Sequence, residues 1–74
     1  MHITVRLFAA LRQGHVAEEA VEVDPGATVR KVMRQLDVPE NQVTLIFVNG
    51  CHADPDQQLR EGDVVALFPP VGGG

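Results

Sequence analysis

The sequence lacks serine, tryptophan and tyrosine, and it has a single lysine and a single cysteine. Without serine, the usual hydroxyl nucleophile of a catalytic triad is missing. Three phenylalanines are too few for a platform on which nucleic-acid bases stack. One cysteine excludes an intrachain disulfide and a multi-cysteine metal site, and it suits a reducing compartment. No run approaches the ~18 apolar residues of a membrane helix, so we expect a cytoplasmic protein that does not enter a membrane.

The sequence has 74 residues and a mass of 8.0 kDa, which is enough for one small domain. Hydrophobic residues make up 45% and charged residues 22%, which is typical of a globular chain. A core of this size supplies only about 3–5 kcal/mol of net stability, which leaves little room for a deep catalytic pocket. Six basic residues against ten acidic ones give a net charge of −4, which argues against a nucleic-acid partner.

The first half of the chain predicts a hairpin followed by a helix. Apolar residues alternate with polar ones in residues 3–8 and again in 16–23, which is typical of half-buried strands, with a turn near Gly14 between them. Thr28 stands at the N-cap position of a helix that we expect to end before Pro39. The apolar stripe of this helix has i, i+3, i+4, i+7 spacing: Val29, Val32, Met33 and Leu36.

The second half predicts two main strands with a brief edge strand between them. Residues 43–48 are almost continuously apolar, so we expect a strand buried on both faces. Asn49-Gly50 is a strong turn signal, after which residues 51–53 return briefly as an edge strand. Residues 64–68 form the last strand, which ends at Pro69-Pro70 because proline cannot donate a ladder hydrogen bond.

The resulting order, ββαββ, predicts an α+β fold with a mixed sheet packed on one main helix. If the first and last strands lie side by side, the crossover makes them parallel in the middle of the sheet, which is the ubiquitin-like β-grasp. We expect residues 1–70 to form this domain and residues 71–74 to form a flexible glycine tail.

The end of the chain carries the most specific motif. Residues 59–71 read Leu-Arg-Glu-Gly-Asp-Val-Val-Ala-Leu-Phe-Pro-Pro-Val and lead to a terminal Gly73-Gly74. Together with Val-Arg-Leu-Phe-Ala at 5–9 and Val-Asn-Gly at 48–50, this segment resembles the MoaD/ThiS family of ubiquitin-like sulfur carrier proteins. Within that family it looks closest to MoaD, the small subunit of molybdopterin synthase.

The resemblance implies a carrier rather than an enzyme. An activating enzyme would use ATP to adenylate Gly74, and a sulfur donor would convert it to a thiocarboxylate for molybdopterin (Mo/W cofactor) biosynthesis. Gly72 and Gly73 would enter the active sites of the partners, which are the activating enzyme and the molybdopterin synthase large subunit or a thiazole synthase. No cofactor or metal would be bound stably. The apolar docking candidates for these partners are Phe8, Phe68, Pro70 and Val71.

Three alternatives remain open. The first is a ThiS-like carrier for the thiazole of thiamin, and the second is a ubiquitin-like modifier conjugated through Gly74 to lysines of other proteins. The third is an interaction module with an inert tail. Among the docking candidates, either Leu67 or Phe68 faces outward, depending on the register of the last strand. Phe8 fits either the core or the surface, and Phe47 is assigned to the core.

Several smaller candidates have an ordinary explanation beside the functional one. Cys51 could relay sulfur but is better explained as a hairpin residue. The histidines lack metal-ligand spacing. Arg30 and Lys31 oppose the helix dipole in the first turn, so either they form a solvated basic face or something other than helix stability keeps them there. The loop carboxylates, either solvated or attractive to a basic partner, are Asp54, Asp56, Glu61 and Asp63.

Overall fold

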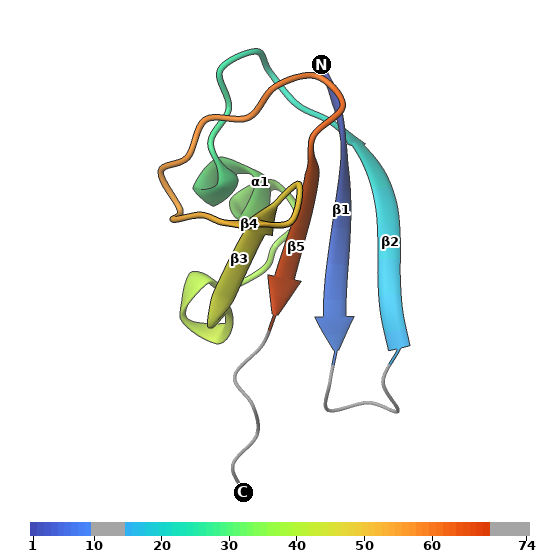
Figure 1. The fold of residues 1–74 in the computed structure, drawn as a ribbon, viewed down its shortest axis with the longest axis vertical. Helices are drawn as coiled ribbons and strands as arrows, with labels where there is room; N and C mark the ends of the chain where they lie inside the picture. Colours follow the sequence, from blue (N-terminus) through green and yellow to red (C-terminus); the bar gives the residue numbers. More distant parts are fainter. Residues whose placement is uncertain (10–14, 69–74) are drawn as a thin grey trace, which may run out of the picture.

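One five-stranded mixed sheet, in the order β2-β1-β5-β3-β4, forms the body of the protein (Figure 1). The computed structural model describes residues 1–9 and 15–68. The turn expected at Gly14 and the segment after Phe68 lie outside the described residues. The strands are β1 (His2–Ala9), β2 (His15–Glu22), β3 (Leu45–Val48), β4 (Cys51–His52) and β5 (Val64–Phe68), and the helices are α1 (Val29–Gln35) and the 3₁₀ turn η1 (Glu40–Gln42).

The centre of the sheet is the parallel pair of β1 and β5. Its register runs from Thr4 opposite Val64 to Leu7 opposite Leu67. β2 pairs antiparallel with β1, and β3 pairs antiparallel with β5 and with the short edge strand β4. The predicted ββαββ order of the main strands, with β4 as the brief edge strand, and the ubiquitin-like β-grasp are therefore confirmed.

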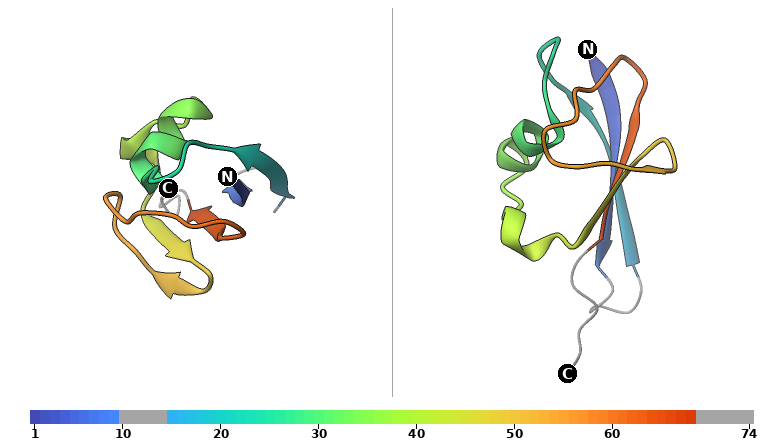
Figure 2. Two further views of the ribbon diagram at one scale, coloured as in Figure 1. Left: turned by 90° about the horizontal axis from the view of Figure 1, so that it is seen from above. Right: turned by 60° about the vertical axis from the view of Figure 1, so that its left-hand side comes forward.

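The core lies between the sheet and α1, which covers one face of the sheet (Figure 2). Alternate residues of each strand point to this face, as the pleat requires. Thr28 caps α1 as predicted, because its Oγ1 accepts a hydrogen bond from the Lys31 N–H at 3.3 Å. None of the described helices is long and apolar enough to cross a membrane. The largest fully buried side chains are Val5, Val29, Val32, Met33, Val65 and Leu67.

The end of α1 has a cause that the sequence analysis did not identify. Asp37 adopts the left-handed conformation with φ 61°. Its N–H donates to the Arg34 carbonyl at 3.1 Å, and the Val38 N–H donates to the Met33 carbonyl at 2.8 Å. These two bonds form a Schellman motif, which satisfies the last carbonyls of the helix. The helix thus ends at Gln35, before Pro39 takes effect.

The expectation that residues 43–48 form a strand buried on both faces is wrong. β3 begins only at Leu45, whose side chain is 40% exposed, and Phe47 is half-buried, whereas Ile46 and Val48 face the core. The reason is that the helix covers a single face of the sheet (Figure 2), so no second layer of helix or sheet lies on the other face of β3 among the described residues. Because residues 43–48 are almost all apolar, the sequence does not show which of them face the core and which face away.

The predicted Asn49-Gly50 turn connects β3 with β4 and also holds the start of β5. Both residues have positive φ, 53° and 82°, as this two-residue hairpin turn requires. The Asn49 Nδ2 donates to Asp63 Oδ1, and its Oδ1 accepts from the Val64 N–H, both at 2.9 Å. Asp63 also accepts from the Arg60 N–H through Oδ2 at 2.8 Å. We call this set the Asn49 clasp.

We expect Met33→Ala to destabilise the protein by about 2–5 kcal/mol, because it leaves a cavity where α1 meets the sheet. Met33 is only 1% exposed. The matched control Met33→Leu nearly conserves volume and should cost less than about 1.5 kcal/mol. Urea unfolding followed by circular dichroism measures both values. Equal stability of the alanine variant and the wild type would contradict this packing.

Candidate functional site

The face of the sheet opposite α1 carries a patch of large apolar side chains. Phe8 of β1, Phe68 of β5, and Leu45 and Phe47 of β3 all lie on it, since each alternates with a residue that faces the core. We call these four residues the outer aromatic face. Among the described side chains, Leu45 is the one large hydrophobic residue that is exposed. The rings of the three phenylalanines are half-buried.

The rings form a continuous row across three strands. Phe8 and Phe68 stack with centroids 4.2 Å apart and an interplanar angle of 13°. Phe47 meets Phe68 edge to face at 5.5 Å and 84°. His52 of β4 continues the row, because its ring lies edge to face on Phe47 at 5.8 Å. Mutual packing thus holds the rings in fixed positions on the surface, which suits a surface prepared for a partner.

The last residue of β5, Phe68, belongs to this row. β5 is the middle strand, with β1 on one side and β3 on the other. At its last residue the Phe68 carbonyl accepts a hydrogen bond from the Thr44 N–H at 2.7 Å. The Phe68 backbone is therefore held on the β3 side, and its ring is stacked on Phe8 of β1. Residue 69 follows Phe68 directly in sequence, beside the outer aromatic face.

The structure shows which way part of the predicted docking set faces. Phe68 faces outward and Leu67 faces the core at 1% exposure, which resolves the alternative left by the sequence. Phe8 lies on the outer face with it. The assignment of Phe47 to the core is wrong, because β3 is covered on one face only. Pro70, Val71, Gly72, Gly73 and Gly74 lie outside the described residues.

Sequence reasoning missed Leu45 and His52 as neighbours of the rings. Leu45 stands opposite Phe68 in the sheet, and His52 stands opposite Phe47. The signal that would have found them is the register of β3 against β5, which depends on strands far apart in the chain. No local pattern contains this register.

The four loop carboxylates singled out in the sequence have internal partners. The Asp54 carboxylate accepts from the Asp56 N–H at 2.8 Å, and Glu61 accepts from the His2 N–H at 3.0 Å. Asp56 binds Arg30, and Asp63 belongs to the Asn49 clasp. These contacts within the chain explain the acidic residues as turn and loop chemistry, with no need for a basic partner protein.

Arg30 in the first turn of α1 joins three segments of the chain. Its guanidinium donates to Glu40 through Nε at 3.0 Å and through Nη2 at 3.2 Å, and it also binds Asp56. The helix, η1 and the loop after β4 are thus connected through one side chain. The hydrogen bond from Arg30 holds the pKa of Glu40 below its ordinary value. This connection is a reason, other than helix stability, for a cation in the first turn.

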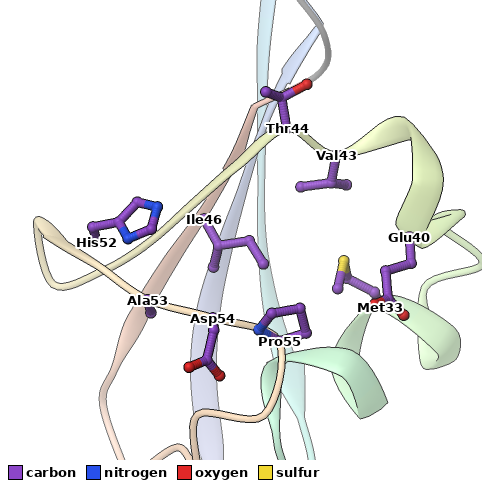
Figure 3. Close-up of a pocket in the computed structure, with 9 residues that line it drawn as sticks. All are labelled: Met33, Glu40, Val43, Thr44, Ile46, His52, Ala53, Asp54 and Pro55. Atoms are coloured by element: carbon purple, nitrogen blue, oxygen red, sulfur yellow. The ribbon is translucent and has the colours of Figure 1, made fainter.

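An open pocket of about 260 Å³ lies between η1 and the loop after β4 (Figure 3). Met33 and Ile46 contribute apolar side chains to it, while Glu40 and Asp54 supply carboxylates. Both carboxylates already accept hydrogen bonds within the protein, Glu40 from Arg30 and Asp54 from the Asp56 N–H. These two carboxylates are therefore engaged in holding the fold.

The remaining sequence candidates are scattered over the molecule. Cys51 is exposed next to the Asn49-Gly50 turn. His2 lies 3.8 Å from Glu61, and His52 lies against Phe47 on another strand. Within residues 1–9 and 15–68, no group of three or more metal-binding side chains gathers.

Comparison with known proteins places the chain among small carriers and modifiers. The model of the ThiS family matches residues 5–74. A protein of Pyrococcus furiosus described as molybdopterin converting factor subunit 1 is 30% identical, with a TM-score of 0.70 and 96% and 99% of the two chains covered. Small archaeal modifier protein 1 of Haloferax volcanii is 27% identical, with a TM-score of 0.69 and coverage of 95% and 98%.

A third solved structure is a complex of subunits 1 and 2 of molybdopterin-converting factor from Helicobacter pylori. The matched chain is 25% identical, with a TM-score of 0.67, and both chains are covered completely. No curated protein matches the sequence.

The Arg30–Glu40 pair predicts a loss of stability in acid. Because the pKa of Glu40 is lowered in the folded state, its contribution is complete above the unfolded pKa and disappears as pH falls through the folded pKa. We expect Glu40→Gln to lower the urea midpoint near neutrality and to flatten its fall toward acid. Glu19→Gln is the control, since Glu19 is exposed and without an ion pair among the described residues. Parallel pH profiles for the wild type and Glu40→Gln would contradict the pairing.

Proposed function

The chain belongs to the ThiS family, and on that premise we propose that it is a sulfur carrier whose terminal Gly74 is adenylated and converted to a thiocarboxylate. The observation that carries the proposal is the extent of the family match, which continues from residue 5 through the final glycine. The held position of Phe68 supports it, because the terminal segment follows directly after this residue in sequence.

The chemistry assigns activation to a partner enzyme. A carboxylate is a poor electrophile, so ATP is needed to form an acyl-adenylate at Gly74. A sulfur donor then displaces AMP and leaves a thiocarboxylate, whose sulfur is nucleophilic at neutral pH. Residues 71–74 act as the segment that enters the partner's active site, where Gly72 and Gly73 keep it narrow. The protein is thus a tethered substrate, and ATP use and a single cysteine suit the cytoplasm.

Molybdopterin synthesis is the pathway we favour. The structure from H. pylori pairs a similar subunit with a second subunit, and the protein of P. furiosus carries the same description. The corresponding partner here is a molybdopterin synthase large subunit, together with an activating enzyme. A ThiS-like role, in which a thiazole synthase takes the sulfur, uses the same terminal chemistry.

A modifier function is the second candidate, and one observation favours it. Small archaeal modifier protein 1 of H. volcanii is about as similar to this chain as the converting-factor subunits are. A modifier shares the adenylation of Gly74 but passes the acyl group to an amine instead of to sulfur. The product therefore distinguishes the two functions.

The outer aromatic face is the surface we assign to partner docking. It is apolar, its rings are held by their own packing, and it includes Phe68, the last residue of β5. Large aromatic side chains in such positions contribute most to protein interfaces. Pro70 and Val71, which follow Phe68 in sequence, extend the same proposal toward Gly74.

We expect Phe68→Asp to remain folded and to lose at least about 2 kcal/mol of partner binding, or roughly 30-fold in affinity. Leu67→Asp, one residue earlier, should unfold the protein, because Leu67 faces the core. Ala20→Asp places the same charge on the outer face at the edge strand β2 and should bind normally. Calorimetric titration with the activating enzyme or the large subunit measures affinity. Undiminished binding by folded Phe68→Asp would remove the docking assignment.

Intact mass spectrometry tests the terminal chemistry. After incubation with the activating enzyme, ATP and a sulfur source, we expect one oxygen of the terminus to be replaced by sulfur. Gly73→Ala should slow adenylation without changing the unfolding midpoint, since an added Cβ widens the segment that must enter the enzyme. Deletion of both Gly73 and Gly74, which removes the terminal double glycine, is the matched negative control. An unmodified mass in the wild type, with an enzyme active on another carrier, would refute the proposed function.

A further inference from the structure

The single lysine of this chain, Lys31, lies in the first turn of α1 with its side chain 60% exposed. We propose that Lys31 is an acceptor site for the protein's own activated C-terminus, so that copies become joined from Gly74 of one to Lys31 of the next. The proposal rests on the activation of Gly74 proposed above. The activated acyl group of Gly74 is the same in both proposals. Lys31 supplies the amine that accepts this group when no sulfur donor does.

Two primary amines are present in the described residues, and they differ in availability. The amino group of Met1 donates to the Val23 carbonyl at 2.7 Å in a partly buried position. Lys31 Nζ lies 3.7 Å from Asp24 Oδ2, and the Asp24 side chain is 83% exposed. An ion pair between two such exposed side chains is loose, so it does not withhold the ε-amine from a reagent. Lys31 is therefore the accessible nucleophile.

The backbone of Lys31 is held while its side chain extends outward. Its N–H donates to Thr28 Oγ1, and the neighbouring Val32 and Met33 are buried in the core. A bond formed at Nζ thus attaches to a rigid helix through a flexible stem, and it disturbs no core contact.

Position also separates Lys31 from the outer aromatic face. The helix α1 lies on one side of the sheet (Figure 2). The alternation along β1, β3 and β5 places Phe8, Phe47 and Phe68 on the other side. An attachment at Lys31 therefore leaves the docking surface of each joined copy uncovered. An acceptor on the outer face of β1 or β5 would instead place the second copy over that surface.

The reaction balances without any oxidant or reductant. An activating enzyme and ATP supply the acyl-adenylate of Gly74, with release of pyrophosphate. The lone pair of neutral Lys31 Nζ attacks the Gly74 carbonyl carbon of a second copy, forming a C–N bond. The bond from that carbon to the AMP oxygen breaks, AMP leaves, and the amine proton passes to solvent. Sulfide competes for the same carbon, so a sulfur source diverts the acyl group from Lys31.

The test uses the full chain with its activating enzyme and ATP, first without and then with a sulfur source. We expect dimers and higher species that resist denaturant and reductant, and we expect their amount to fall at least several-fold when sulfide is added. Trypsin should release a branched peptide in which residues 31–34 carry residues 61–74 on Lys31. Lys31→Arg keeps the positive charge and should abolish these species, while Arg34→Gln, which removes a charge from the same helix, should leave them unchanged.

A second arm activates Gly74 without the enzyme, as a small thioester made by intein cleavage, and follows aminolysis by the same peptide mapping. Joined species at Lys31 in this arm support the inference even if the enzyme does not act on Gly74, an outcome that would refute the proposed function alone. Thiocarboxylate formation without joined species in either arm would overturn the inference and leave the proposed function intact. A branch at Met1, or multimers that persist in Lys31→Arg, would also overturn it.

Discussion

The parallel pairing of β1 with β5 is the constraint on which the rest of the structure depends. Two strands from opposite ends of the chain can lie parallel and adjacent only if the intervening segment crosses over, and α1 makes that crossing on one face. The core therefore forms on that side alone. The same pairing places the last strand in the middle of the sheet, with a hydrogen-bonded neighbour on each side.

This arrangement divides the protein into two faces with different properties. On the helix side, buried aliphatic residues supply the stability, and charged side chains such as Arg30 and Lys31 lie outside them. On the other side, aromatic residues remain half-buried, packed against one another instead of against a second layer. A domain this small is too short to build a second layer on that side, and the docking proposed above would supply one from a partner.

Much of the fold was predictable because its signals are local. Alternation in β1, the Thr28 cap and the Asn49-Gly50 turn each depend on a few neighbouring residues, and together they indicate the order of elements. The failures concern residues whose environment depends on distant parts of the chain. The exposure of Phe47 follows from the number of layers in the fold, which its uniformly apolar neighbours do not show.

The candidate site likewise combines a feature that the sequence shows with features that depend on distant strand pairings. The sequence alone points to Gly74, because a terminal double glycine is visible without any structure. The orientation of Phe68 needed the register of β5, and the row formed with Phe47 and His52 needed three strand pairings at once. The role of Arg30 was hidden for a similar reason, since its partners are in segments far from it in sequence.

The Asn49 clasp makes one side-chain amide a point of chemical vulnerability. Asparagine followed by glycine is the dipeptide in which the side chain most readily loses ammonia to become aspartate. Here that conversion would replace the donor to Asp63 by a second carboxylate, at a contact that is now 2.9 Å long. Two like charges at that distance repel, so ageing at this one position would loosen the start of the strand that leads to the end of the chain.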